Sequence, residues 1–152
     1  MARVHVQSWR ETYRGVMTDE VLDDPRLLDR RERFWNVALT DVHYERNRVA
    51  VAVAGGCVVG IAMSGPASDE ARRDEVHLHL LYLLAGFHGS GLGDRLLNAV
   101  IERSDDVSLW VADPNPRAQA FYAKQGFAPD GAHKSDDGLS EVRMIRRAPR
   151  TK

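Results

Sequence analysis

The sequence predicts an α/β fold in which a mixed central β-sheet is flanked by helices. Two short runs rich in Val and Ala meet at Gly55-Gly56, which is a strong signal for a β-hairpin. Residues 74–112 then have the pattern of strand, glycine-rich turn, helix and strand, which predicts a right-handed crossover between parallel strands. Helical periodicity at the start and strand-like segments at the end complete a single domain over residues 1–152.

The chain begins with two amphipathic segments that predict helices. Val4, Trp9 and Tyr13 recur among polar residues at helical spacing, so the first helix should end near Gly15. The second helix should begin at the Asp-Pro pair of "DPRLLDRRERFWNVAL" (residues 24–39), which suits an N-cap and first helical position. Its apolar residues are Leu27, Leu28, Phe34, Trp35 and Leu39.

After the hairpin, "DEVHLHLLYLLA" (residues 74–85) is apolar enough to lie at the centre of the sheet. Strict alternation along this strand places four side chains on one side: His77, His79, Leu81 and Leu83. The helix after the glycines has an apolar face of Leu92, Leu96, Leu97, Val100 and Ile101. "VSLWVA" (residues 107–112) is a further strand, and two last strands flank the Asp-Asp-Gly at residues 136–138. The helix that follows residues 107–112 has Asn115 as N-cap, Pro116 at its first position and Gly126 as its stop.

Composition and charge limit the class of protein. Of the 152 residues, 43% are hydrophobic and 28% charged, and the formal net charge is −1. This balance favours a globular domain and gives no basis for binding nucleic acid or a membrane. Cys57 is the only cysteine, and the N-terminal segment carries charge throughout, unlike a secretory signal. A cytoplasmic protein without disulfides is therefore expected.

The glycine-rich turn of "FHGSGLGDRLLNAVIE" (residues 87–102) directly precedes a helix. The first amides of a helix lack carbonyl partners and carry partial positive charge, so glycines there let a phosphate approach several N–H groups. The turn has neither the Gly-x-Gly-x-x-Gly of dinucleotide-binding proteins nor the Gly-Lys-Ser/Thr of a P-loop. The turn therefore predicts a different phosphate ligand, with a tight turn that binds nothing as the alternative.

Several segments together resemble one family. "LYLLAGFHGSGLGDRLL" resembles the acetyl-CoA signature of the GNAT acyltransferases, a Gln/Arg-x-x-Gly-x-Gly/Ala pattern after a central strand. "LWVADPNPRAQAFYAKQGF" is similar to the second GNAT motif, and "VHVQSWRETYRG" to the first helix of many bacterial members. The resemblance covers essentially the whole chain and implies an acetyl-CoA-dependent N-acetyltransferase that works by direct transfer in a ternary complex. Family members usually begin with a strand that this sequence lacks, so either the true start lies upstream or this is a shortened variant. The exposed edge of the neighbouring strand would predict a homodimer.

The resemblance also implies where coenzyme A is held. Its diphosphate would lie on the amides of Gly89, Ser90, Gly91, Leu92, Gly93 and Asp94. The pantetheine arm would pair with the strand backbone around Leu81 and Leu83, and Asn115 would contact the arm or the thioester region. His88 stands where the family usually has Gln or Arg, and an unperturbed histidine has a pKa of about 6.5. Cofactor affinity is therefore expected to be weaker and more pH-dependent.

The resemblance assigns two candidate catalytic residues. Tyr122 holds the position of the acid that protonates the leaving thiolate, with a half-buried structural tyrosine as the alternative. His77 falls where many members carry a glutamate base, and Glu75, a water relay or a purely structural histidine remain alternatives. His77, His79 and His88 offer three nitrogens but no acidic or cysteine ligand at a recognisable spacing, so no metal is expected.

The acceptor is expected to be a small-molecule amine or the N-terminal amine of a peptide or protein. By the same resemblance, its site is walled by Trp9, Tyr13 and Arg14 from "SWRETYRG" and by the turn "HKSDDGLSE" (residues 133–141). A place in the core is the favoured alternative for Trp9 and an equal alternative for Tyr13. A protein that binds coenzyme A or acyl-CoA without turnover is the alternative function. A structural or interaction domain without a ligand is a second alternative.

Overall fold

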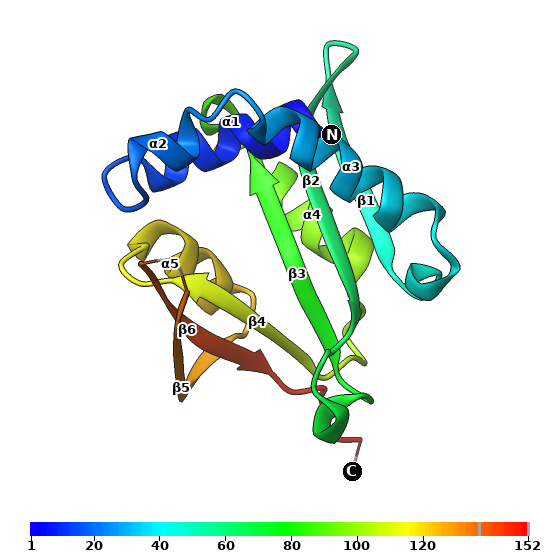
Figure 1. Cartoon of the computed structure of the whole chain (residues 1–152). Helices are drawn as coiled ribbons and strands as arrows, with labels where there is room; N and C mark the ends of the chain where they lie inside the picture. The colour runs from blue at the N-terminus through cyan, green and yellow to red at the C-terminus, as the bar shows by residue number, and fades with distance from the viewer. Residues whose placement is uncertain (137, 152) are drawn as a thin grey trace.

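The computed structural model describes residues 1–136 and 138–151, in which a six-stranded mixed sheet has helices on both faces (Figure 1). The strand order is β1-β2-β3-β4-β6-β5. The strands are β1 (Arg48–Ala54), β2 (Cys57–Pro66), β3 (Val76–Leu83), β4 (Val107–Ala112), β5 (Ala128–Asp136) and β6 (Leu139–Arg146). The α-helices are α1 (Ala2–Tyr13), α2 (Asp19–Leu22), α3 (Leu27–Thr40), α4 (Leu92–Val100) and α5 (Pro116–Lys124). Single 3₁₀ turns lie at Val42–Tyr44, Glu70–Arg72 and Ala85–Phe87.

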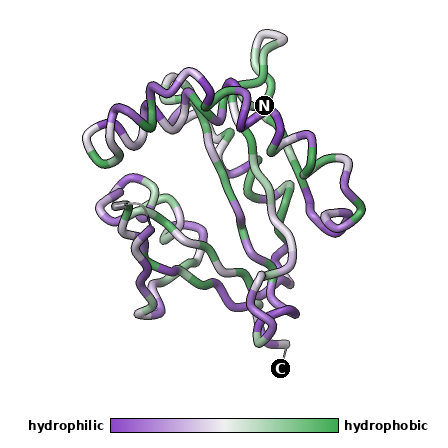
Figure 2. The backbone as a smooth tube through the Cα atoms, viewed as in Figure 1, coloured by the Kyte–Doolittle hydropathy of each residue, from purple (hydrophilic) through white to green (hydrophobic). Residues whose placement is uncertain are grey.

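The predicted mixed sheet flanked by helices is confirmed. Gly55 and Gly56, both with positive φ, join β1 and β2 in an antiparallel hairpin, and β3 pairs with β4 in parallel. β3 is central, between β2 and β4. Figure 2 shows hydrophilic residues over the loop between β2 and β3. None of the described helices has both the length and the apolar character needed to cross a membrane.

Three details of the helices differ from the prediction. The helix expected from Asp24 begins at Leu27, because the Asp24 carboxylate accepts the backbone N–H of Arg26 and so shapes the turn before the helix. α4 ends at Val100, and Ile101 is extended, although its side chain is buried. The short helix α2 was not anticipated, since its four residues are too few to show a helical period.

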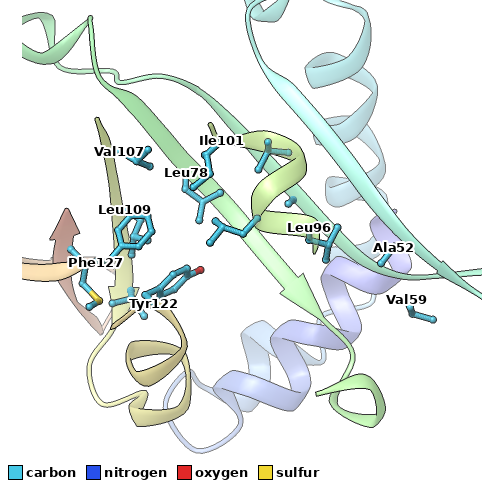
Figure 3. Close-up of a cluster of buried hydrophobic side chains, with 14 residues drawn as sticks. Ala52, Val59, Leu78, Leu96, Ile101, Val107, Leu109, Tyr122 and Phe127 are labelled. Carbon is cyan, nitrogen blue, oxygen red and sulfur yellow. The ribbon is translucent and has the colours of Figure 1, made fainter. Parts of the chain in front are cut away.

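Two hydrophobic clusters cover the two faces of the sheet. The first lies under α4 and α5 and includes Leu96, Leu109 and Tyr122 (Figure 3). The second lies under α1 and α3 and includes Trp35 and Leu80. Full burial of one large aliphatic side chain contributes about 1.5–3 kcal/mol to folding, so both clusters hold the helices firmly against the sheet.

A β-bulge in β3 changes the predicted alternation. Leu78 lies opposite Ser64 and Leu80 lies opposite Met63, so His79 is an extra residue without a partner in β2. Leu78 packs into the first cluster, whereas Leu80 packs into the second. The prediction that strict alternation holds along this strand is therefore wrong, because the bulge moves the side chains after His79 to the other face.

The sheet opens at the same place. Pairing between β3 and β4 covers only residues 76–78 against 107–109, although both strands continue beyond it. Figure 1 shows the two strands diverging from this short parallel ladder. Beyond residue 78, the edge of β3 that faces β4 is open. The bulge and the divergence together create the space in which the candidate site lies.

Candidate functional site

A cavity of about 930 Å³ lies between the diverging strands, a size typical of small-molecule sites. Its walls come from the end of α1, from β3, from the glycine-rich turn before α4, from β4, from α5, and from the hairpin of β5 and β6. Segments that are far apart in the sequence therefore meet around one opening. Most of the residues predicted as functional contribute to this cavity.

The open edge of β3 presents backbone groups to the cavity. The amide of Leu84 donates to the carbonyl of Val59 at 3.0 Å, which makes this a hydrogen-bonded pair of the antiparallel ladder. Alternation along the ladder then directs the N–H and C=O groups of Leu81 and Leu83 away from β2. Both residues line the cavity. These two residues are the ones predicted to pair with an extended ligand arm.

The glycine turn owes its conformation to two positions. Gly89 and Gly91 have φ angles of 78° and 85°, a region that L-residues rarely adopt, and Gly91 is the N-cap of α4. Gly93 has no positive φ but is closely packed, because a Cβ there would lie 3.2 Å from the Phe121 ring of α5, tighter than an ordinary contact. The amides of Gly93 and Asp94 belong to the first turn of α4, where no intrahelical carbonyl is available.

Within the predicted phosphate-binding set, Gly89, Gly91, Gly93 and Asp94 line the cavity. Ser90 and Leu92 are not among the lining residues. The Ser90 hydroxyl donates to the carbonyl of Phe87 and accepts the amide of Leu92 at 3.3 Å, so it stabilises the turn itself. The Leu92 side chain packs against the first hydrophobic cluster. Asp94 accepts a hydrogen bond from the Gln125 amide at 2.8 Å, which ties α4 to the end of α5.

His88 lies at the cavity wall, where its ring is held by two neighbours. Its Nε2 is 2.8 Å from the carbonyl of Leu83, and Nη1 of Arg117 lies 2.8 Å from its Nδ1 and 2.9 Å from its Nε2. The Leu83 carbonyl only accepts, so its hydrogen bond with His88 requires the proton on Nε2. The hydrogen bond that His88 was expected to offer a ligand is therefore made to Leu83. Arg117, which the sequence analysis missed, brings a positive charge to the same wall.

Helix α5 places two predicted residues in the cavity. Asn115 is its N-cap, as predicted, and the Asn115 side chain accepts the amide of Ala118 at 3.3 Å. Tyr122 lines the cavity but is only 8% exposed, and its ring packs edge-on against Phe121 and Phe127. Burial raises the pKa of the Tyr122 hydroxyl, so the group keeps its proton at neutral pH. A protonated phenol at this position is able to donate a proton.

His77 and His79 lie side by side in the cavity wall, with ring centroids 5.2 Å apart. The Nδ1 of His77 is 3.0 Å from the hydroxyl of buried Ser108. Burial, and then the charges of neighbours headed by His79, lowers the pKa of His77 to about 4. Glu75 is not among the lining residues and instead pairs with Arg147 at 2.8 Å. Of the two candidate bases, the structure brings His77 to the cavity.

The three histidines weighed as metal ligands do not gather. His77 and His79 are neighbours, whereas His88 bonds to Leu83 and Arg117. Over residues 1–136 and 138–151, no group of three or more His, Cys, Asp and Glu side chains is arranged to hold a metal ion.

The end of the cavity that was predicted to take the acceptor contains a cluster of tyrosines. Tyr13 lines it from α1 and Tyr82 from β3, and the indole N–H of Trp9 donates to the Tyr82 hydroxyl at 3.0 Å. Burial raises the pKa values of Tyr13 and Tyr82. Arg14, expected to meet the acceptor, is not among the lining residues, because its guanidinium pairs with Asp19 and Asp23 at 2.9 Å each.

The predicted acceptor turn contributes two charged residues that the sequence analysis did not single out. Lys134 of β5 and Glu141 of β6 lie opposite each other in the ladder and line the cavity beside Trp110 of β4. Their side chains pair at 3.2 Å. The alternation of side chains along the two final strands was the signal that could have identified Lys134 and Glu141. A strand pattern alone, however, does not show which face of an edge hairpin lines a cavity. Asp137 of the same turn lies outside the described residues.

Comparison with protein families and curated proteins gives consistent similarities. The model of the acetyltransferase (GNAT) family matches residues 6–127. A probable N-acetyltransferase of Mycobacterium tuberculosis is 31% identical over 162 residues, which cover 98% of this chain and 88% of that protein. An uncharacterized N-acetyltransferase of Bacillus subtilis is 26% identical over 149 residues, which cover 95% of this chain and 81% of that protein.

Solved structures share the fold at lower sequence identity. The PaiA N-acetyltransferase of Thermoplasma acidophilum, in complex with coenzyme A, aligns with a TM-score of 0.71 at 18% identity, covering 96% of this chain and 89% of that one. The structure described as histone acetyltransferase HPA2 and related acetyltransferase of Corynebacterium glutamicum aligns with a TM-score of 0.71 at 21% identity, covering 99% of this chain and 90% of that one.

Proposed function

Because this chain belongs to the acetyltransferase (GNAT) family, we propose that it transfers the acetyl group of acetyl-coenzyme A directly to a primary amine in a ternary complex. The observation that carries the proposal is the split between β3 and β4. Along this split, the backbone of Leu81 and the N–H of Leu83, which point away from β2, lie in one cavity with the start of helix α4 and the Tyr122 hydroxyl. An extended thioester with a diphosphate at one end fits that order of groups.

The residues present suit coenzyme A. The first-turn amides of Gly93 and Asp94 offer hydrogen bonds to a phosphate, and the Arg117 guanidinium adds a positive charge beside the same turn. Leu81 and Leu83 would hold the arm as a further strand would be held, and Asn115 would contact it from α5. Coenzyme A supplies the thioester, and the protein supplies its position and the proton transfers.

The chemistry then assigns roles to two side chains. The acceptor nitrogen must lose a proton before it bonds to the acetyl carbon, and the C–S bond breaks as that bond forms. His77 is neutral at pH 7, which leaves it able to take the amine proton directly or through water. Tyr122 keeps its proton and is the donor to the departing thiolate, and the second proton that the nitrogen loses as the amide forms restores the tyrosine. The products are an amide and free coenzyme A.

The proposal also covers the oligomeric state, the cellular compartment and the class of acceptor. The outer edge of β1 is unpaired in the described sheet, and Val51 and Val53 on this strand are exposed, which supports pairing of two copies in a homodimer. Cys57 is a free, exposed thiol, which suits a reducing cytoplasm. The acceptor is a small-molecule amine or an amine of a peptide or protein, and residues 1–152 act as one domain.

The test follows coenzyme A release from acetyl-coenzyme A with a thiol reagent across a panel of amines and short peptides. Tyr122→Phe keeps the buried ring and removes the proton donor, so kcat should fall by about 10²-fold or more while acetyl-coenzyme A still raises the melting temperature. Tyr44→Phe is the matched control, because Tyr44 is 46% exposed and not among the lining residues.

Full activity in Tyr122→Phe would contradict the assigned acid. If no amine accelerates release while acetyl-coenzyme A still stabilises the protein, the alternative of a non-catalytic acyl-CoA-binding protein is favoured. If acetyl-coenzyme A does not stabilise the protein at all, the cavity serves another ligand.

A further inference from the structure

We propose that Glu141 and Trp110 receive the ammonium group of an aliphatic primary amine, at the position that the ammonium group of Lys134 occupies in this structure. The inference rests on the proposed acetyl transfer and deepens it. It names the acceptor as an amine at the end of a flexible alkyl chain, as in a lysine side chain. An α-amine next to a carbonyl group would fit less well.

The geometry around Lys134 is that of a bound alkylammonium ion. The Lys134 Nζ lies 3.2 Å from Glu141 Oε2 and 4.7 Å from the centroid of the Trp110 ring. A carboxylate and the face of an indole are the two groups that hold an ammonium ion best when they act together. All three residues line the cavity, so this cation site opens into the space proposed for the reaction.

The two members of the ion pair differ in how firmly they are placed. The Glu141 side chain is 18% exposed, whereas the Lys134 side chain is 44% exposed. A half-exposed lysine in an ion pair contributes little to stability, about 0–1 kcal/mol, and is able to leave without unfolding its strand. Glu141 would then stay behind as a carboxylate that needs a cation. The acceptor ammonium is the cation that the reaction brings.

A second ion pair on the same hairpin shows the contrast. Arg143 and Asp130 pair at 2.6 Å, their side chains are 25% and 13% exposed, and neither is among the lining residues. That pair joins the two strands as a structural element. The Lys134–Glu141 pair differs because it is in the cavity wall and its cation is loosely held.

At this end of the cavity, Glu141 supplies the negative charge that an ammonium ion would pair with. Tyr13 and Tyr82 are neutral at pH 7 because burial raises their pKa values, and His77 and His79 are neutral because burial lowers theirs. Glu141 is the acidic residue among the lining residues at this end, since Asp94 lies at the glycine turn. Once Lys134 moves aside, an incoming ammonium meets the Glu141 carboxylate and neutral aromatic rings, while the Arg143 guanidinium stays over the Trp110 ring at 5.7 Å from its centroid, held by Asp130.

The first experiment measures binding without turnover. ¹⁵N-labelled protein saturated with coenzyme A is titrated with n-butylamine, and the indole N–H signal of Trp110 is followed. Wild-type protein should show a saturable shift. E141Q should bind n-butylamine about 10- to 100-fold more weakly, because a charge-assisted hydrogen bond is lost. K134M should bind it up to about fivefold more tightly, because the competing ammonium is gone.

The control is D105N, which removes a carboxylate of similar burial (17% exposed) that is not among the lining residues and should bind n-butylamine as wild type does. Unchanged binding in E141Q would overturn the inference. Weaker binding in K134M would overturn it too, because Lys134 would then support the ligand instead of occupying its place. The opposite directions expected for E141Q and K134M guard against a simple folding defect, which would weaken both.

The second experiment uses two isomeric acceptors. Nα-acetyl-lysinamide presents only the ε-amine, and Nε-acetyl-lysinamide presents only the α-amine. The kcat/KM of the wild type should favour the ε-amine by about tenfold or more, and E141Q should reduce this preference through the KM of the amine. Turnover with a preference for the α-amine would contradict the inference and leave the proposed function intact. Absence of turnover with normal n-butylamine binding would contradict the proposed function alone.

Discussion

At the scale of single residues, burial sets the protonation of the histidines. The pKa of His5 is lowered to about 3 by burial first and by the Arg31 charge second, and that of His77 to about 4. The indole N–H of Trp35 donates to Nδ1 of His5 at 3.2 Å, which fixes this nitrogen as an acceptor. Burial therefore makes His5 a neutral core residue and leaves His77 unprotonated in the cavity wall.

Protonation of His5 should make the fold sensitive to acid. The unfolded chain takes up a proton at His5 below pH 6.5, whereas the folded chain resists until about pH 3. The stability that His5 supports is therefore complete above pH 6.5 and is lost as the pH falls towards 3. The free energy of unfolding, measured with urea, should drop by about 2 kcal/mol between pH 7 and pH 5 from His5 alone.

The matched variant is His5→Gln, whose amide oxygen is still able to accept the N–H of Trp35. It should unfold more easily at pH 7 but lose the part of the pH dependence that His5 causes. An unchanged pH slope in this variant would mean that other groups, such as His77, are responsible for the acid sensitivity.

At the scale of elements, the glycine-rich turn depends on backbone conformation more than on composition. Gly91 has a φ of 85°, and a Cβ added there would meet nothing within 4 Å, so a substitution is limited by the backbone and not by space. Gly91→Ala should lower the free energy of unfolding by about 1–2 kcal/mol, the usual cost of a left-handed alanine. It should also weaken coenzyme A binding, because the start of α4 would shift.

Gly86 provides the control for this prediction. It also has open space around a Cβ, but its φ is not positive, so Gly86→Ala should leave urea unfolding and coenzyme A binding nearly unchanged. Equal stability of the two alanine variants would show that the turn tolerates strain. Normal coenzyme A binding by a destabilised Gly91→Ala would show that the phosphates lie elsewhere.

The elements also show what the sequence was able to predict. The Gly55-Gly56 hairpin, the Asn115 cap and the strand at residues 107–112 follow from local signals, and all three are present. The bulge at His79 has no glycine or proline to mark it and arises from pairing with Met63 and Ser64 of another strand. Arg117 and His88 belong to different segments that meet only in the folded protein, so no local sequence pattern predicts their contact.

At the scale of the whole molecule, the sheet consists of two parts joined by a short parallel ladder at residues 76–78 and 107–109. A ligand that pairs with β3 and contacts α5 would connect the two parts. Ligand at about 100 times its Kd adds about 2.7 kcal/mol to the free energy of unfolding. The stabilisation should therefore be accompanied by a local change at the open edge of β3.

Amide hydrogen exchange identifies that change residue by residue. Without ligand, the amides of Leu80 and Tyr82 point to β2 and should exchange slowly, whereas those of Leu81 and Leu83 point into the split and should exchange faster. Saturating coenzyme A should slow exchange at Leu81 and Leu83 by about tenfold or more and leave Leu80 and Tyr82 unchanged. If coenzyme A raises the melting temperature and yet these two amides keep their rates, the arm does not pair with β3. The split would then serve only to admit the acceptor.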